Sequence, residues 1–379
     1  MSLYKKSVIG IDISCSQIHF VEMSRSSQTP VIQKTGKVFL DKDVVKEGKV
    51  VNQDKLKNVL EELWKKNRIK SKEIILGISN NDIIMRFITL PKMPLDKLSN
   101  LIKFQVADYM PVNIDDYELD YTIISENANE SGSYYNVLLV AAGKKMLYEF
   151  INAFSTVNSS IKDIKSSVLV MDKLVPGEYR NSVSVVVNLS SEACNLLIVN
   201  NNLPAFARTI LLKENMHREI DIINKEKFSA SWNANAGYSY RDTVPTENTK
   251  LVGISNTAVM EKEGLHSFEH SNLQCNQNKL ILNIVSFVGD EIRSSISYFQ
   301  SQNRDSFIEK IFLTGCACSN EAVYEGLADY LGMNVEILQP YENLFSVLSK
   351  KNKDKVIVDD YEPSKFAIAL SLALHGLED

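Results

Sequence analysis

Residues 10–16 read GIDISCS, and residues 186–192 read VVNLSSE. Each stretch is an apolar strand that ends in an acidic or amide residue, one further apolar residue and a turn of small polar residues, after which a second strand begins. Asp12 and Asn188 hold matching places and are 176 residues apart. A pattern repeated at this distance predicts two similar halves that face each other.

The residues around the first copy predict one α/β layer. Residues 8–13, 18–23 and 31–40 have the alternation and β-branched content of strands. One face of an amphipathic helix follows, formed by Leu56, Val59, Leu60, Leu63 and Trp64. Residues 74–78 return to the sheet as a further strand. This order predicts a sheet that is covered by a helix.

A block from residue 83 to residue 154 has its own order of elements: strand, helix, strand, strand, helix. Its strands are predicted at residues 83–90, 117–124 and 135–141. Pro94 opens the first helix and Pro111 stops it. The apolar residues of the closing helix are Leu147, Phe150, Ile151 and Phe154. The order predicts a small, separate α/β subdomain.

The second half repeats the alternation of strands and helices. Strands are predicted at residues 183–189, 196–199, 203–208, 311–314 and 335–338. Helices are predicted at residues 284–300, 321–331 and 364–375. Residues 228–250 are rich in Ser, Asn, Thr and Gly and predict a polar loop or insert. The apolar C-terminal helix is expected to be buried against the first half, the alternative being a membrane-surface anchor.

Length and charge restrict the function. A chain of 379 residues holds two or three domains, and a formal charge of −5 makes nucleic acid an unexpected partner. The five cysteines are scattered and odd in number, which indicates reduced thiols in the cytosol. We see no signal peptide and no apolar run that could span a membrane. We therefore expect a cytosolic protein that meets a membrane through a partner.

The repeated turns have the chemistry of phosphate recognition. A tight turn points backbone N–H groups at anionic oxygens, and a carboxylate at a strand end holds a hydrated Mg²⁺. Gly315 ends a third strand, where the backbone could approach a flat base closely. The predicted cleft residues are Asp12, Ser14, Cys15, Ser16, Asn188, Ser190, Ser191, Gly315 and Cys316. We predict no metal site, because His266 and His270 have no third ligand in the sequence.

These motifs resemble the two phosphate motifs and the adenosine motif of the actin/Hsp70/FtsA superfamily. More specifically, the chain resembles the PilM family of type IV pilus assembly proteins. That resemblance is carried by RFITLPKMP at residues 86–94, IKFQVADYMP at residues 102–111, LDY at residues 119–121 and the closing helix at residues 366–374. It implies an actin-like (RNase H-like) two-lobed α/β fold with an inserted subdomain of the kind called 1C.

The resemblance implies a division of the chain. The first lobe, 1A, takes residues 1–81, 161–180 and 355–379, and subdomain 1C takes residues 82–160. The second lobe, 2A/2B, takes residues 181–354.

The resemblance also implies a role. A PilM-type protein is a cytoplasmic scaffold, peripheral to the inner membrane, which binds the N-terminal tail of a PilN-type membrane protein in a groove beside subdomain 1C. It links components of the alignment complex to the pilus motors, and it could self-associate. The residues expected to bind the partner are Ile84, Arg86, Ile88, Leu98, Ile102, Gln105 and Tyr109.

Four positions depart from the family pattern. Ser14 and Ser190 replace glycines, His19 replaces a lysine that contacts phosphate, and Asn188 replaces an aspartate. Because an amide cannot act as a carboxylate base, we expect no catalytic residue and no ATP hydrolysis. ATP or ADP with Mg²⁺ would then be absent or structural. Two other functions stay open: an active ATPase of the superfamily, and a membrane-associated filament protein of the FtsA type.

Overall fold

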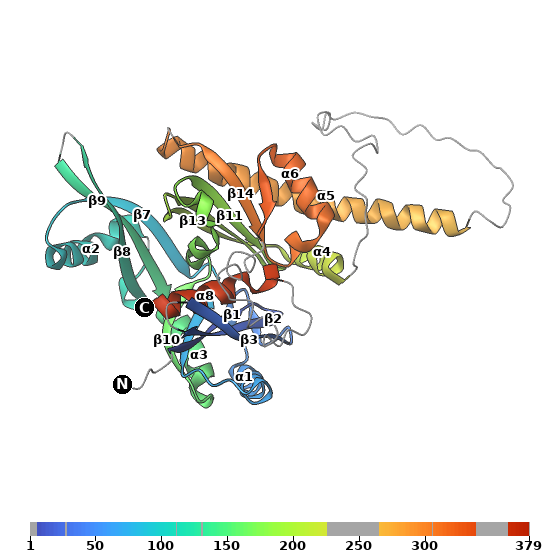
Figure 1. Cartoon of the computed structure of the whole chain (residues 1–379), viewed down its shortest axis with the longest axis horizontal. Coiled ribbons are helices and arrows are strands. Elements are labelled where there is room, and N and C mark those ends of the chain that lie inside the picture. Colours follow the sequence, from blue (N-terminus) through green and yellow to red (C-terminus); the bar gives the residue numbers. More distant parts are fainter. Residues whose placement is uncertain are drawn as a thin grey trace.

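The computed structural model describes residues 6–26, 29–110, 112–129, 132–225, 265–304, 306–338 and 363–378. The polar insert that the sequence predicts at residues 228–250 lies outside the described residues. Figure 1 shows the second lobe above the first, with a small sheet at the left and a long helix, α5, extending to the right.

The first lobe is built on a five-stranded sheet of order β10-β6-β1-β2-β3. Its strands are β1 (Ser7–Ile13), β2 (Gln17–Ser26), β3 (Thr29–Phe39), β6 (Glu73–Ile78) and β10 (Ser160–Ser166). β1, β2 and β3 form an antiparallel meander, whereas β6 and β10 run parallel to β1. A two-stranded hairpin, β4 (Val45–Lys46) and β5 (Lys49–Val50), stands beside it.

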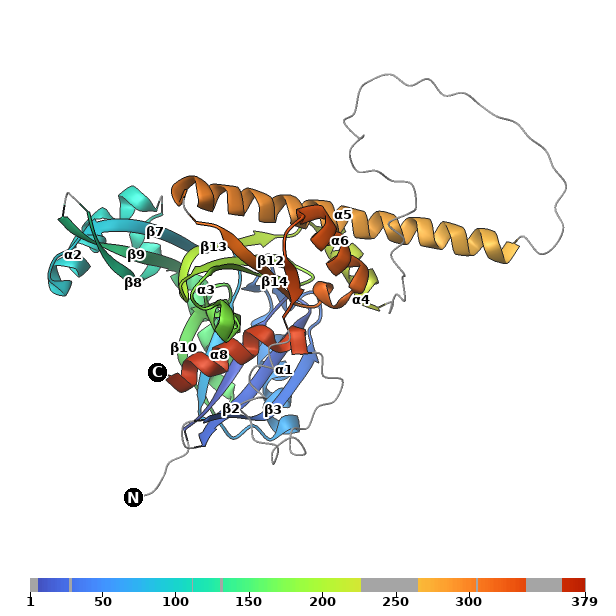
Figure 2. The same ribbon diagram turned by 45° about the horizontal axis from the view of Figure 1, so that its top comes forward.

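Both faces of this sheet are covered because β1 is apolar on both sides. Ile9 and Ile11 face α1 (Gln53–Asn67) and α3 (Lys144–Ala153), and Val8 faces α8 (Ala367–Glu378). Nine residues of α8 are buried, which confirms the predicted burial of the C-terminal helix. Figure 2 shows α8 between the first sheet and the second lobe.

The second lobe repeats the first. Its sheet has the order β13-β12-β11-β14-β15, again with an antiparallel meander and two parallel strands. The strands are β11 (Val183–Leu189), β12 (Ala193–Asn200), β13 (Leu203–Leu211), β14 (Ile308–Thr314) and β15 (Val335–Ile337). The helices are α4 (Glu214–Lys225), α5 (Leu265–Gln302) and α6 (Glu321–Leu331). The predicted structural repeat is confirmed.

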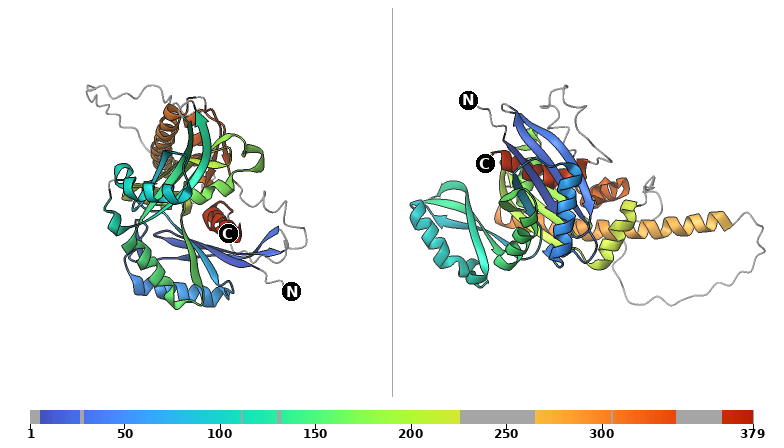
Figure 3. Two further views of the ribbon diagram at one scale, coloured as in Figure 1. Left: turned by 90° about the vertical axis from the view of Figure 1, so that its left-hand side faces the viewer. Right: turned by 90° about the horizontal axis from the view of Figure 1, so that it is seen from below.

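A three-stranded sheet of order β7-β9-β8 stands apart from both lobes (Figure 3). It consists of β7 (Ile83–Pro91), β8 (Tyr117–Asn129) and β9 (Gly132–Gly143), with α2 (Leu95–Tyr109) packed on one face and a single turn, η1 (Ile114–Asp116), before β8. The helix that follows, α3, packs instead in the core beneath the first sheet. The sequence pattern had grouped α3 with this block, but its apolar face is completed by the first lobe.

An apolar core joins the lobes at the base of the cleft between them. It brings Ile75 of β6 and Leu372 of α8 against Val186 of β11 and Phe312 of β14. The chain crosses between the lobes through short turns, η3 (Leu169–Leu174), η4 (Gly177–Tyr179) and η7 (Pro363–Phe366). Two further turns are η2 (Phe154–Thr156) and η5 (Ala317–Ser319). None of the described helices is long and apolar enough to cross a membrane.

Several elements differ from the sequence-based expectation. The short strands β4 and β5, the strand β10 and the helix α4 were not predicted, and α5 begins at Leu265 rather than at residue 284. β10 reads SIKDIKS, in which charged residues interrupt the apolar pattern, because it is the edge strand of its sheet. α4 is amphipathic, but it lies in the part of the chain where the resemblance to the family is weakest.

Candidate functional site

The two repeated turns meet across the cleft between the lobes. A cavity of about 40 Å³ separates them. Its lining consists of Asp12, Ile13, Ser14, Glu47, Gly48, Ser79, Asn188, Ser190, Glu192, Ala193, Asn195 and Leu211. The structure thus brings together four of the predicted cleft residues, one pair from each copy of the repeat.

Ser14 and Ser190 act alike in the two turns. The Ser14 hydroxyl donates to the carbonyl of Gln17 at 3.0 Å, and the Gln17 amide donates back to that hydroxyl at 3.1 Å. The Ser190 hydroxyl and Ala193 make the same pair of bonds, both at 3.0 Å. Serine in place of glycine therefore closes each turn by a side-chain hydrogen bond, in agreement with the predicted turn role.

Glu192, which the sequence did not single out, reaches across the cleft. Its Oε2 accepts a hydrogen bond from the backbone N–H of Cys15 at 2.7 Å, and the Ser16 backbone N–H also acts on the same carboxylate. Burial raises the pKa of Glu192, and the hydrogen bonds from Cys15 oppose that rise. A carboxylate of the second lobe thus occupies the anion-binding face of the first turn.

Asp12 is an uncommonly weak acid here. Burial raises its pKa to about 7; the Ser167 hydroxyl, 3.2 Å from Oδ1, lowers it, and the negative charge of Glu192 raises it further. Near neutral pH the Asp12 carboxyl is therefore partly protonated.

A second contact joins the lobes beside the cavity. The Ser79 hydroxyl, which follows β6, donates to Oδ1 of Asn195 on β12 at 2.9 Å. Thr209 of β13 donates to the same oxygen at 2.8 Å. Asn188 pairs with Asn195 in the ladder between β11 and β12, so its amide lies within this polar cluster.

Gly315 approaches the protein's own backbone. Its φ is +95°, and a Cβ there would lie 2.5 Å from the carbonyl oxygen of Leu189 and 2.7 Å from Oδ1 of Asn188. Its N–H donates to the carbonyl of Ser364 at 3.3 Å. The Cys316 thiol points at the Leu189 carbonyl at 3.8 Å. Position 315 requires glycine, as predicted, but the reason is its close contact with β11.

His19 is buried as a neutral ring. Burial lowers its pKa to about 4, and the positive charges of Lys37 and Lys365 lower it further. The ring packs edge-to-face against Phe366 at 5.1 Å. The ring is therefore uncharged at neutral pH.

The cleft does not fit a nucleotide as it stands. Small-molecule sites have volumes of roughly 300–1,000 Å³, whereas the cavity here measures about 40 Å³, close to the space of one water molecule. Side chains of both lobes fill the remainder. Among the described residues no group of three or more His, Cys, Asp or Glu side chains could hold a metal ion.

A much larger groove, of about 1110 Å³, lies between the three-stranded sheet and the first lobe. One wall comes from β8 and β9, and the other from β10, η3 and α3. The eight consecutive residues 159–166 all line it, so the edge of β10 faces the groove as well as its side chains. His375 near the end of α8 closes one part of the wall.

None of the seven predicted partner residues lines this groove. Leu98 and Ile102 are buried between α2 and the three-stranded sheet, and Ile84, Ile88 and Tyr109 pack against the same core. Arg86 is exposed and Gln105 half-buried. The motif residues identify the subdomain, but most of them form its interior. Predicting the groove would have required the position of β10, which the sequence pattern did not reveal.

Comparisons with known proteins agree with the architecture. Residues 10–222 match the family described as type IV pilus assembly protein PilM. The solved PilM-PilN type IV pilus biogenesis complex has a TM-score of 0.71 at 20% identity, covering 98% of this chain and 99% of that one. EutJ of Carboxydothermus hydrogenoformans has a TM-score of 0.48 at 9% identity, covering 97% and 89%. MreB5 of Spiroplasma citri bound to ADP has a TM-score of 0.41 at 10% identity, covering 92% and 98%. The family match and the TM-score of 0.71 with the PilM-PilN complex confirm the predicted two-lobed actin-like fold.

Proposed function

The chain belongs to the PilM family of type IV pilus assembly proteins, and we propose that it is a scaffold that holds the N-terminal tail of a PilN-type inner-membrane protein in the groove between β8 and β10. The solved relative with the same fold is a complex of PilM with PilN. The groove is by far the larger of the two cavities described here.

The observation that carries this proposal is that two strand edges border the groove. β10 ends the first sheet and β8 ends the three-stranded sheet, and among the described strands each is paired on one side alone. An unpaired edge presents N–H and C=O groups that an extended peptide can satisfy. A tail lying in the groove could therefore add a strand, while its alternate side chains enter the apolar wall.

The apolar part of the groove is accessible. Ile151 on α3 and Leu203 at the start of β13 line it and are 44% and 40% exposed. Burying such side chains against an apolar peptide contributes about 25 cal/mol for each Å² removed from water. We therefore expect apolar residues of the tail to supply most of the binding free energy.

Asp120 of β8 gives the groove a site for a basic group. Its carboxylate is exposed, lines the groove and accepts a hydrogen bond from the N–H of Tyr121 at 2.8 Å, and no cation pairs with it among the described residues. The neighbouring Glu118 lies 3.9 Å from Lys144. We propose that a lysine or arginine of the tail pairs with Asp120.

Titration calorimetry with a synthetic PilN-type N-terminal peptide tests this function. Ile151→Glu should weaken peptide binding at least tenfold, because it places a charge in the apolar wall. Tyr148→Glu is the matched control, since Tyr148 is on the same helix, is 64% exposed and does not line the groove. Asp120→Asn should weaken binding severalfold, whereas Asp116→Asn, an exposed acid of η1 outside the groove, should not. Unchanged binding by both groove variants would place the tail elsewhere.

We also propose that this scaffold works without ATP hydrolysis. The closed cleft, the neutral His19 and the amide of Asn188 support that view. A steady release of phosphate from Mg-ATP by the pure protein would contradict it and favour an active ATPase. The burial of α8 argues against an FtsA-type membrane anchor. We propose that the protein lies in the cytoplasm and is held at the inner membrane through its partner. There it would be linked to motor or alignment components.

We further propose the division into lobe 1A, subdomain 1C and a second lobe. The packing supports an end of subdomain 1C near Gly143, where β9 ends and α3 enters the core of the first lobe. That boundary is earlier than residue 160, where the resemblance to the family placed it.

A further inference from the structure

The first turn presents two successive backbone N–H groups to the cleft. The N–H and hydroxyl of Ser14 both donate to the carbonyl of Gln17, so they are used within the turn. The N–H of Cys15 points outward to Glu192 at 2.7 Å, and that of Ser16 acts on the same carboxylate. Successive N–H groups that converge in this way form an anion-binding concavity.

The backbone of Glu192 is fixed in the place from which its side chain reaches that concavity. Its N–H donates to the Ser190 hydroxyl at 3.3 Å, and its carbonyl accepts from the N–H of Leu212 at 2.8 Å. The second turn therefore holds Glu192 at a position from which its side chain crosses the cleft. Glu192 also holds the place in the second copy of the repeat that Ser16 holds in the first.

A carboxylate and a phosphate group bind such N–H groups through the same kind of oxygen. A charge-assisted bond of 2.7 Å has the length expected for a strong interaction. Two anions cannot share these donors, because their charges would repel within a mostly buried site. A phosphate group could reach the first turn only after Glu192 had left it.

We propose that Glu192 is an internal ligand of the first turn, which fastens the two lobes together and keeps phosphate-bearing ligands out of the cleft. The bond from Ser79 to Asn195 at 2.9 Å lies beside it and closes the same mouth. The apolar core around Val186 and Phe312 stays at the base of the cleft. Opening therefore breaks the contacts of Glu192 with the first turn and the bond from Ser79 to Asn195, while the lobes pivot on that base.

Hydrogen exchange on the full chain tests the fastening. In Glu192→Ala the amides of Cys15 and Ser16, which lose their acceptor, should exchange at least tenfold faster than in the wild type. Glu192→Gln should keep most of the protection, because its amide oxygen still accepts from Cys15. Glu178→Ala, which removes an exposed acid on η4, is the control and should change nothing in this segment. Equal exchange in Glu192→Ala and the wild type overturns the proposal.

Calorimetric titration with Mg-ADP tests the exclusion of phosphate. The wild type should bind at least tenfold more weakly than Glu192→Ala, with Glu192→Gln between them because it lacks the repelling charge. Equal affinities, or no binding by either protein, overturn this part of the proposal. The PilN-type peptide should bind all three proteins alike, so a failure here is distinguishable from a failure of the groove proposal.

Discussion

A β-carbon on Gly10 would stand 2.1 Å from the carbonyl oxygen of Ala369. Gly10 is in the middle of β1, and Ala369 is in the first turn of α8, so the helix lies directly on the strand at this point. No other amino acid permits so close a contact between backbones. The close packing of the C-terminal helix on the first strand therefore depends on the absence of a side chain at residue 10.

Gly10→Ala should destabilise the protein by about 1–3 kcal/mol or more, since the added methyl group overpacks a site bounded by backbone. The midpoint of urea unfolding measures the change. Gly177→Ala is the control, because a Cβ there meets nothing within 4 Å. Its free energy of unfolding should change by less than about 1 kcal/mol. Equal midpoints for the two variants would contradict the observed packing of α8 on β1.

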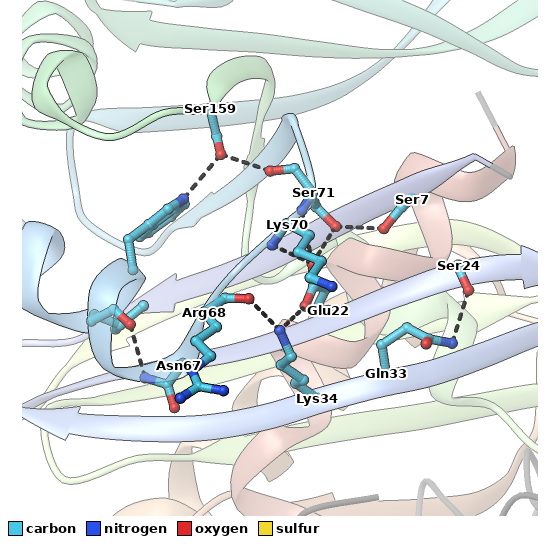
Figure 4. Close-up of polar contacts among 12 residues, drawn as sticks. Ser7, Glu22, Ser24, Gln33, Lys34, Asn67, Arg68, Lys70, Ser71 and Ser159 are labelled. Atoms are coloured by element: carbon cyan, nitrogen blue, oxygen red, sulfur yellow. Dashed lines mark hydrogen bonds and ion pairs between the residues drawn. The ribbon is translucent and has the colours of Figure 1, made fainter. Parts of the chain in front are cut away.

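Glu22 is the buried acid that ties β2 to the loop before β6 (Figure 4). Its Oε1 accepts from the N–H groups of Lys70 and Ser71 and from the Ser71 hydroxyl at 2.8–2.9 Å, and Lys34 lies 3.2 Å from Oε2. Burial raises the pKa of Glu22, but these hydrogen bonds and Lys34 outweigh it, so the pKa is lowered. Its stabilising effect is therefore full above the ordinary glutamate pKa and is lost as the pH falls.

Glu22→Ala leaves the part-buried N–H of Lys70 and the buried N–H of Ser71 without an acceptor and should cost about 2–5 kcal/mol. Glu22→Gln keeps an oxygen acceptor and should cost clearly less. Glu61→Ala, on the exposed face of α1, serves as the control and should be nearly neutral. Thermal unfolding at pH 7 compares the three. A smaller loss for Glu22→Ala than for Glu22→Gln would rule out this role of the hydrogen bonds.

The raised pKa of Asp12 should make the protein more stable at acid pH than at alkaline pH. Its folded pKa, about 7, lies above the unfolded value of 3.8, so the folded state holds the extra proton. The corresponding stability is complete below about pH 4 and is lost as the pH rises through 7. Asp12→Asn removes this ionisation and should stabilise the protein at pH 8 by up to about 4 kcal/mol, with little effect at pH 4. A pH-independent effect of the substitution on chemical unfolding would disprove this account.

His19 should have the opposite effect. Its folded pKa, about 4, lies below the ordinary value of 6.5, because burial and two lysines disfavour the charged ring. The stability that it contributes is present above pH 6.5 and disappears as the pH falls through 4, which amounts to about 3 kcal/mol. His19→Gln should therefore flatten the decline in unfolding free energy between pH 6.5 and pH 4. Identical slopes for the variant and the wild type would show that the ring is not held neutral.

Much of the fold was predictable because its signals are local. The repeat around Asp12 and Asn188 is visible since each strand and turn depends on neighbouring residues, and α6 was predicted with its observed bounds, residues 321–331, from the same kind of periodicity. The motif at residues 86–94 indicated the family although Leu90 alone of its nine residues is buried. β10 was missed because an edge strand is stabilised by its pairing with β6 and needs no apolar alternation of its own.

By itself, the sequence determined the two matching halves and the order of strands and helices in the inserted block. Only the tertiary structure decided that Glu192 binds the Cys15 amide, 177 residues away, and that the groove lies between β8 and β10. The reason is physical. A strand or a turn is set by its own residues, whereas contacts between lobes depend on how separately patterned halves dock, which no local pattern records.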